Sequence, residues 1–218
     1  MNRHEQKTTI FIVTLLLTLT AGLAAQELAE IQLPKPRIDG GVPLMQALAR
    51  RSTSRDFTAD PLPAQTMSDL LWAAWGVNRP ESKKRTAPSA MNWQEIDLYI
   101  VMEKGIYLYD AAAHIMKPVA AGDFRALAGR QEFVKTAPLT LVFVADPARM
   151  SKAPADKQEI FAWTDSAFIS QNVYLFCASA GLATGVRASL DAPALAKAMK
   201  LQTGQIITMA QSVGFPKK

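Results

Sequence analysis

Cysteine and histidine are scarce in this sequence, and their scarcity excludes several kinds of site. The 218 residues contain one cysteine, Cys177, and two histidines, His4 and His114. A single cysteine excludes an internal disulfide and a metal site made of several cysteines. Its apolar neighbours at 173–176 favour a buried, inert thiol. Two histidines do not favour a Ser-His-Asp triad or a histidine-ligated metal, so no metal ligands and no catalytic side chain are assigned.

A strong excess of charge is also absent. The 24 basic and 19 acidic residues give a formal net charge of +5, and removing residues 1–25 lowers it to +4. Because the basic residues are mostly scattered, we expect no nucleic-acid partner. The chain has no Gly-x-Gly-x-x-Gly, which argues against a Rossmann dinucleotide site.

The only long apolar run lies at the N-terminus. Arg3 and Lys7 precede an apolar stretch at 9–23 that ends in small residues at 21–25. This pattern predicts a secretory signal peptide at 1–25 and export, to the periplasm. The run is shorter than the roughly 20 residues of a spanning helix. A membrane anchor is the alternative if the signal stays uncleaved.

The rest of the chain predicts one domain. Residues 26–39, with Pro34 and Pro36, have no periodicity and are expected to be an extended linker before a domain at 40–218. Helices are expected at 43–51, 63–75, 123–130, 158–180 and from 191, and strands at 96–102, 106–110, 114–119, 138–146, 184–189 and 205–213. Interleaved helices and strands of this kind favour an α+β three-layer sandwich. Helix 158–180 is apolar on more than one face, which predicts burial between layers or against a second subunit.

Three short segments carry the chemistry. Residues 50–57 read RRSTSRDF, residues 85–92 read RTAPSAMN, and residues 214–218 read GFPKK. A phosphate group favours guanidinium and hydroxyl donors, because charge-assisted hydrogen bonds are about twice as strong as neutral ones. The first segment offers Arg51, Ser52, Thr53 and Arg55 for such a site.

In order and spacing, the three segments resemble the nitroreductase superfamily. Its members carry an Arg-x-Ser/Thr-x-Arg-x-Phe stretch after the first helix, a Pro-Ser-x-x-Asn loop and a late Gly-Tyr/Phe-Pro. The resemblance covers about residues 40–216 and is nearest to the branch that includes the azoline dehydrogenases. It implies a nitroreductase-like sandwich with a central mixed, mostly antiparallel sheet, a homodimer with the active site at the subunit interface, and FMN as cofactor.

The resemblance also implies the roles of individual residues. Arg51, Ser52, Thr53 and Arg55 would bind the phosphate, and Thr184 and Gly185 would contact the pyrimidine or N5 edge of the flavin. The loop with Pro88, Ser89, Ala90 and Asn92 would come from the partner subunit and lie on the flavin ring. Many relatives place an Arg or Lys a few residues after the late Gly-Phe-Pro. This chain ends there, so that contact falls to Lys217 or Lys218.

The function that follows is an exported FMN-dependent oxidoreductase that transfers a hydride through flavin N5 to or from a small organic substrate. Nicotinamide cofactors are not expected beyond the inner membrane, so the electron partner is unknown. The alternative is a catalytically silent exported protein that binds a flavin or another planar ligand on the same fold. A third possibility is a structural dimer without a cofactor.

Overall fold

A seven-stranded sheet forms the centre of the protein. The computed structural model describes residues 28–217, and the expected signal peptide lies outside these residues. The strands are β1 (Ile31–Gln32), β4 (Ile96–Met102), β5 (Gly105–Asp110), β6 (Ile115–Ala121), β7 (Leu139–Ala145), β8 (Ala183–Arg187) and β9 (Ile206–Gly214). Their order is β1-β6-β5-β4-β7-β9-β8, with β8 at one edge. Every neighbouring pair is antiparallel, where a mixed but mostly antiparallel sheet was expected.

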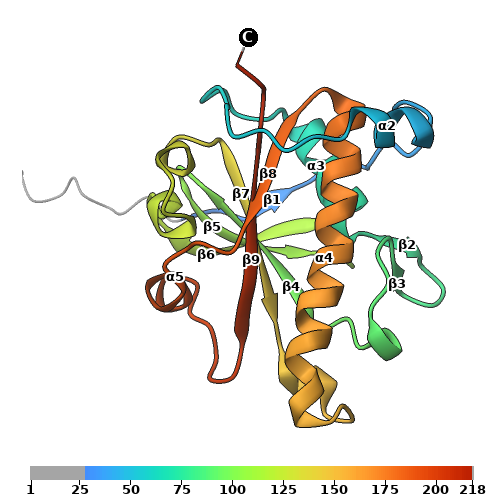
Figure 1. Cartoon of the computed structure of the whole chain (residues 1–218), viewed down its shortest axis with the longest axis vertical. Helices are drawn as coiled ribbons and strands as arrows, with labels where there is room; N and C mark the ends of the chain where they lie inside the picture. Colours follow the sequence, from blue (N-terminus) through green and yellow to red (C-terminus); the bar gives the residue numbers. More distant parts are fainter. Residues whose placement is uncertain (1–27, 218) are drawn as a thin grey trace, which may run out of the picture.

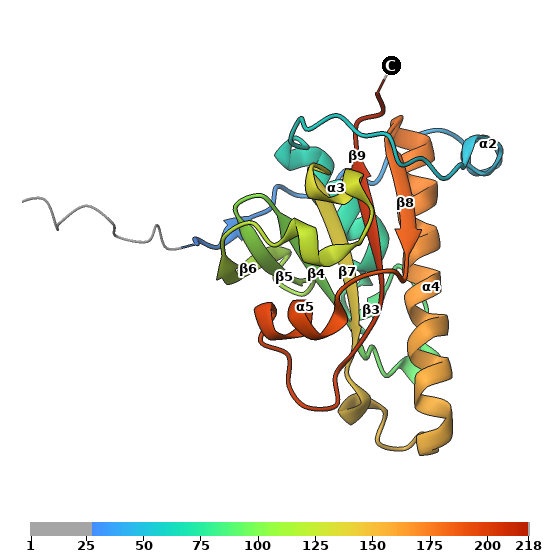
Figure 2. The same cartoon turned by 60° about the vertical axis from the view of Figure 1, so that its left-hand side comes forward.

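Helices cover both faces of this sheet, which confirms the three-layer α+β sandwich. One face carries α3 (Ala64–Trp75) and the long α4 (Ala155–Ala180), and α2 (Leu44–Arg50) packs beside α4. The other face carries α5 (Ala192–Ala198) and the 3-10 turns η2 (Arg125–Ala128) and η3 (Glu132–Lys135). The sheet lies between these layers (Figures 1 and 2). The turns η1 (Ala90–Asn92) and η4 (Pro147–Met150) and the small hairpin β2 (Val77–Arg79) and β3 (Lys84–Arg85) lie outside them.

Strand β7 shows why the core forms here. All seven of its residues are buried, as expected for a continuous apolar run in a strand covered on both faces. Leu141 and Phe143 belong to the cluster under α3 and α4. Val142 and Val144 belong to the cluster under α5. The two-residue alternation of a strand therefore supplies both cores from one segment.

Helix α4 buries one face and exposes another. Ile169, Val173 and Cys177 are fully buried against the sheet. Trp163 and Phe168 remain 37% and 45% exposed. The helix ends at Gly181, whose φ of 69° is a left-handed conformation that glycine adopts without strain. The second apolar face predicted from the sequence is thus present and exposed to solvent in the described part of the chain.

Two predicted helices differ from the structure. The helix expected at 123–130 is reduced to the single turn η2, because Gly129 leaves the helical region and the Asp123 carboxylate bonds Arg125 directly. The helix expected at 43–51 forms as α2, but its apolar side chains face outward. Leu44 and Leu48 are exposed and only Ala47 is buried.

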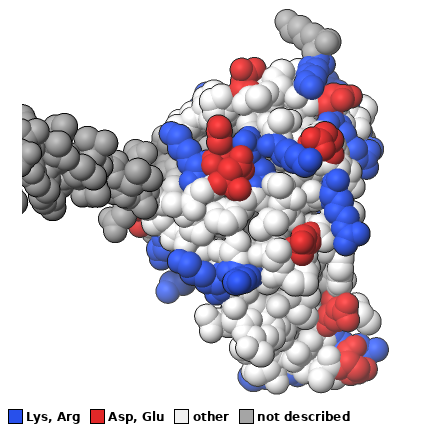
Figure 3. All heavy atoms as spheres, turned by 90° about the vertical axis from the view of Figure 1, so that its left-hand side faces the viewer, with Lys and Arg blue, Asp and Glu red and all other residues white. Residues whose placement is uncertain are grey.

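The described part of the segment before residue 40 is extended and attached to the domain. Strand β1 pairs with β6, and the Arg37 guanidinium is ion-paired with Asp69 on α3 at 2.9 Å. Within residues 28–217, no helix combines the length and apolar content needed to cross a bilayer. On the face seen in Figure 3, basic side chains lie among acidic ones.

Candidate functional site

The first and third sequence segments meet at the edge strand β8. The Ser54 amide donates a hydrogen bond of 2.9 Å to the Thr184 carbonyl, so residues 53–55 lie against β8. The Thr58 amide donates to the Phe215 carbonyl at 2.9 Å, and the Lys217 amide donates to the Asp56 carbonyl at 3.3 Å. Backbone pairing therefore brings together two segments that are about 160 residues apart in the sequence.

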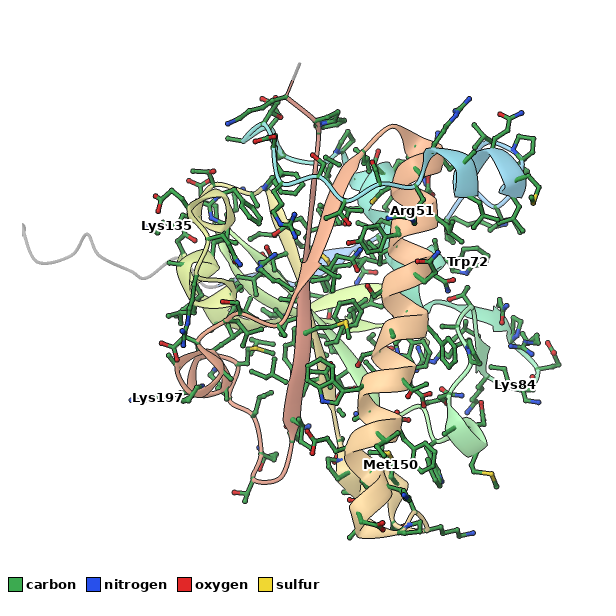
Figure 4. The ribbon with its side chains drawn as sticks, in the orientation of Figure 1. Arg51, Trp72, Lys84, Lys135, Met150 and Lys197 are labelled. Carbon is green, nitrogen blue, oxygen red and sulfur yellow. The ribbon has the colours of Figure 1, made fainter. Side chains whose placement is uncertain are left out.

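Tyr174 of α4 fixes the arginine-rich segment from one side. Its Oη lies 3.0 Å from Thr53 Oγ1 and accepts a hydrogen bond from the Val186 amide at 3.1 Å. The Arg51 guanidinium lies over the Tyr174 ring, 5.4 Å from its centroid, at a distance suited to a cation–π contact. Figure 4 shows Arg51 beside the half of α4 that lies away from Met150. Ser52 is exposed next to this contact.

Gly185 is glycine because the segment at 53–55 covers it. A Cβ at this position would lie 2.9 Å from the Ser54 carbonyl oxygen and 3.6 Å from Cγ of Arg55. The neighbouring Thr184 is buried. Its hydroxyl donates to the Ser212 carbonyl and accepts from Gln211. The Thr184 hydroxyl is thus engaged inside the sheet, and close packing of the chain on itself explains Gly185.

Arg187 is a component of this region that sequence reasoning missed. It is 9% exposed, and its guanidinium donates to Ala128 O at 2.9 Å and Ser212 Oγ at 3.0 Å. Burial and the charge of Arg55 lower the pKa of Arg187 to about 10. Among residues 28–217, no carboxylate is ion-paired with Arg51, Arg55 or Arg187. A single arginine in an otherwise uncharged strand was the available signal.

The second sequence segment lies elsewhere on the protomer. The turn η1 follows Pro88, which is exposed, and the Ala90 amide donates a 2.7 Å hydrogen bond to Asp165 of α4. Ser89 Oγ accepts from the Gln94 amide at 3.0 Å, and Asn92 Oδ1 accepts from Gln94 Nε2 at 3.2 Å. Asp165 and Tyr174 are nine residues apart on α4, about 14 Å along the helix axis. One protomer therefore brings together two of the three segments.

Two carboxyl groups meet behind the loop at 88–92. Glu95 is fully buried, and neither of its carboxyl oxygens has a hydrogen-bond donor among the described residues. Burial raises the pKa of Glu95 to about 8, and the neighbouring Asp165 adds to this increase. Glu95 therefore keeps a proton at neutral pH, while Asp165 accepts the Ala90 amide. A buried acid at the start of a core strand was the only sequence signal for this pair.

A pocket of about 540 Å³ lies between residues 37–41, α3 and the C-terminal part of α4. Trp72, Phe176 and Phe215 contribute its aromatic lining. None of the residues that the sequence assigned to the cofactor lines it. The pocket adjoins the C-terminal segment through Phe215 but is separate from the arginine-rich segment.

Apolar side chains are exposed along α2 and α4. Leu44 and Met45 on α2 are 62% and 75% exposed, and Ile160 on α4 is 55% exposed, in addition to Trp163 and Phe168. Met91 in the loop at 88–92 is 83% exposed. Exposed apolar groups gathered on adjacent elements commonly mark a protein interface.

The three-layer sandwich around an antiparallel sheet, with the three segments in this order, defines the class of protein as an oxidoreductase of the nitroreductase type. A model of the Nitroreductase family matches residues 47–215. The chain belongs to the Nitroreductase family.

Individual proteins agree with this assignment. The chain is 39% identical to a "putative nitroreductase" of Ralstonia eutropha JMP134, whose crystal structure matches with a TM-score of 0.84 over 89% of this chain and 93% of that one. It is 28% identical over 165 residues to a "putative nitroreductase" of Methanocaldococcus jannaschii, covering 71% of this chain and 81% of that protein. A "putative nitroreductase" of Desulfovibrio desulfuricans, solved in complex with FMN, shares the fold at a TM-score of 0.59 and 18% identity, over 82% of this chain and 89% of that chain.

Proposed function

We propose that this chain is an exported, homodimeric, FMN-dependent oxidoreductase that transfers a hydride to or from a small organic substrate. The observation that carries the proposal is the group of three arginines, Arg51, Arg55 and Arg187, around residues 184–187 of β8. No carboxylate within residues 28–217 is ion-paired with them. Burying or crowding unpaired cations is costly, so such a group is suited to a bound anion.

The residues present fit the phosphate of FMN. A phosphate monoester carries close to two negative charges at pH 7, and arginine binds it through paired N–H donors. Arg51 and Arg55 would hold the phosphate together with the hydroxyls of Ser52 and Thr53. The hydrogen bond between the hydroxyls of Tyr174 and Thr53 limits the movement of Thr53 and so orients its hydroxyl before the ligand arrives. Lys217 follows the backbone pairing at Asp56 and stays exposed to supply a further charge.

When bound, FMN would supply the redox chemistry: its ring accepts a hydride, which is two electrons and one proton, and carries one negative charge until it passes them on. The protein binds and orients the cofactor and provides positive charge near the ring. The segment at 53–55 packs directly on Gly185, so β8 holds the arginine-rich segment in a fixed position beside it. No side chain is assigned as an acid, base or nucleophile.

A second copy of the chain would complete the site. The exposed apolar side chains of α2 and α4 favour a homodimer with this face as the interface. The loop with Pro88, Ser89, Ala90 and Asn92 would then lie on the flavin bound by the partner. Met91, the most exposed of these apolar groups, would contribute a contact that a single protomer leaves in solvent.

The proposals of export and of an electron partner other than nicotinamide rest on the sequence alone. The signal at 1–25 favours export, and an exported enzyme would receive electrons from a partner other than a soluble nicotinamide pool. Within the family, the sequence resemblance favours the azoline-dehydrogenase-like branch, and the proposed substrate is a small organic molecule. Fractionation of cells that express the full chain, followed by N-terminal sequencing of the recovered protein, tests export; an intact chain recovered from the cytoplasm would contradict it.

The binding experiment is a titration of purified residues 26–218 with FMN, followed by the quenching of flavin fluorescence. Arg51→Ala and Arg55→Ala should each weaken binding by roughly 10- to 100-fold, because each removes a charged hydrogen-bond donor worth about 1.5–3 kcal/mol. Arg50→Ala is the matched control, since Arg50 is a neighbouring exposed arginine on α2. A mature chain that binds no FMN, or variants that bind as the control does, would refute the proposed site.

The second candidate is a silent flavin-binding protein on the same fold. The groups at β8 are all binding groups, and none is positioned as a proton donor, which is the observation that favours it. Flavin that binds but is neither reduced nor reoxidised by any tested organic donor, acceptor or redox partner would support the carrier. Repeated cycling of the bound flavin would exclude it.

A further inference from the structure

The pocket between residues 37–41, α3 and the end of α4 has no part in the proposed cofactor site. Its volume of about 540 Å³ lies within the roughly 300–1,000 Å³ that is typical of small-molecule sites. The lining contains none of the residues assigned to FMN. The pocket is therefore a candidate site for a second, different ligand.

The N-terminal wall of this pocket is fixed to α3 and α4. Arg37 donates to the Asp69 carboxylate through its amide at 2.8 Å and through its guanidinium at 2.9 and 3.0 Å. The Val42 amide donates to Ser179 Oγ at 2.9 Å. Gly41 has a φ of 92°, and a Cβ there would lie 2.6 Å from Ser179 Oγ, so only glycine allows this close approach. The pocket is thus formed before a ligand arrives.

Three aromatic rings give the pocket its apolar lining. They belong to Trp72 of α3, Phe176 of α4 and Phe215 beyond β9, and all three side chains are half-buried. Trp72 Nε1 donates to the Val77 carbonyl at 3.2 Å, which holds the indole ring in one orientation. The faces of aromatic rings attract flat apolar groups and also cations. The lining therefore suits a flat organic molecule.

The charged residues of the lining determine which sign of charge the pocket accepts. These residues are Arg37, Asp39 and Asp69. Arg37 and Asp69 compensate each other through their ion pair. Within residues 28–217, no cation is ion-paired with Asp39. The lining thus carries one carboxylate in excess, which attracts a cation and repels an anion.

We propose that this pocket binds a small organic cation, an amine with a flat apolar body. The body packs against Trp72, Phe176 and Phe215, and the ammonium group faces Asp39. Aromatic rings beside a carboxylate are the elements that recognise such cations in proteins. The site is separate from the proposed cofactor site and does not depend on the proposed function.

The experiment is isothermal titration calorimetry of residues 26–218 with two matched probes. Tryptamine and indole-3-propionate share an indole ring and a two-carbon chain, but they carry opposite charges at pH 7. Tryptamine should bind roughly 3- to 30-fold more tightly, because an exposed ion pair and a cation–π contact together contribute at this level.

Variants of Asp39 test the role of its charge. Asp39→Asn should remove part of the preference for tryptamine. Asp39→Lys should weaken the binding of tryptamine and strengthen that of indole-3-propionate. Asp39 is exposed, so both variants should fold as the wild type does. Asp60→Lys is the matched control, since Asp60 is an exposed carboxylate outside the pocket, and it should change neither affinity.

Two further variants test where the probe binds. Ala73→Phe fills the pocket from α3 and should abolish the binding of both probes. Arg55→Ala lies outside the pocket and should leave the affinity for tryptamine unchanged. Circular dichroism checks that each variant is folded, and Asp39→Lys decides the outcome if Ala73→Phe is not.

The outcomes separate this proposal from the proposed function. It is overturned if tryptamine does not bind at millimolar concentration, if both probes bind equally well, or if Asp39→Lys leaves both affinities unchanged. Tryptamine binding that is lost in Arg55→Ala and kept in folded Ala73→Phe would place the probe at the cofactor site and also overturn it. A chain that binds tryptamine as expected but no FMN overturns only the proposed function.

Discussion

Replacing Glu95 with glutamine should abolish a pH dependence of the free energy of unfolding. The ordinary pKa of this carboxyl group is 4.5, and burial raises it to about 8 in the folded protein, with Asp165 adding to the increase. Between these two pH values the folded protein keeps a proton that the unfolded chain has lost. Because the unfolded state binds fewer protons, stability falls as pH rises, by about 1.4 kcal/mol per pH unit.

The size of the effect follows from this slope. Over the interval from pH 4.5 to about 8, the loss is at most on the order of 5 kcal/mol, and it stops above the folded-state pKa. This is a large share of the 5–15 kcal/mol that stabilises a typical domain. The loop at 88–92 should respond first, because its Ala90 amide is held by Asp165, the direct neighbour of the ionising group.

The assay is urea unfolding followed by tryptophan fluorescence, at half-unit steps from pH 5 to 9. Glu95→Gln replaces the ionisable carboxyl group with a neutral amide, whose NH2 group can still donate a hydrogen bond to Asp165. The stability of the variant minus that of the wild type should therefore increase with pH up to about 8 and then stay constant. Other titrating groups, such as His114, whose pKa burial lowers, are common to both proteins and cancel in the difference.

Glu81→Gln is the control. Glu81 is exposed in the turn between β2 and β3, and the curve of this variant should run parallel to the wild type. A difference between Glu95→Gln and wild type that is the same at pH 5 and pH 9 would refute the reasoning. It would mean that burial beside Asp165 does not keep Glu95 protonated in the folded protein.

Three further outcomes are expected. Gly185→Ala should lower both the melting temperature and the affinity for FMN relative to Gly40→Ala. The added carbon at Gly185 would lie 2.9 Å from the Ser54 carbonyl oxygen, whereas nothing lies within 4 Å of a Cβ at Gly40. Equal melting temperatures in calorimetry and equal affinities in titration would contradict this. Tyr174→Phe should cost about 1–3 kcal/mol in urea unfolding, since the Val186 amide loses its buried acceptor, and an unchanged midpoint would count against it. Cys177 is fully buried and its pKa is raised by burial, so a thiol reagent at pH 8 should modify it only after unfolding; rapid reaction of the native protein would show that this part of the core opens.

Repeated burial made most regular elements predictable. Strand β7 follows from a nearly continuous apolar run, and helix α3 follows from apolar residues three to four positions apart. The structure places both within a few residues of their expected bounds. Strand β1 was not predicted, because two extended residues have no period and their partner β6 lies more than 80 residues away. The turn η2 was expected to be a longer helix, because the sequence shows the cap at Asp123 but not the extended backbone at Gly129.

The site was predictable only in part, for a related reason. The arginine-rich segment and the C-terminal segment carry recognisable residue types, and the structure pairs them with β8 and with each other. Arg187 and the pair of Glu95 and Asp165 carry no spacing signal. The shifted pKa values of Arg187 and Glu95 result from burial and from neighbours that are distant in sequence, and a single sequence shows neither.

The separation of the segments along α4 carries the last prediction. Phe168 is exposed between Asp165, which holds the loop at 88–92, and Tyr174, which holds Thr53. A two-fold axis crossing α4 near Phe168 would exchange the two ends of the helix between protomers. The loop of one chain would then face the arginines of its partner, which would explain why one protomer holds the two segments at points about 14 Å apart along α4. Phe168→Glu should therefore abolish the dimer in analytical ultracentrifugation and weaken FMN binding at the same protein concentration. Lys197→Glu, an exposed charge change on α5 at the other face of the sheet, should do neither. A Phe168→Glu monomer that binds FMN as tightly as the wild type would show that each protomer holds the cofactor alone.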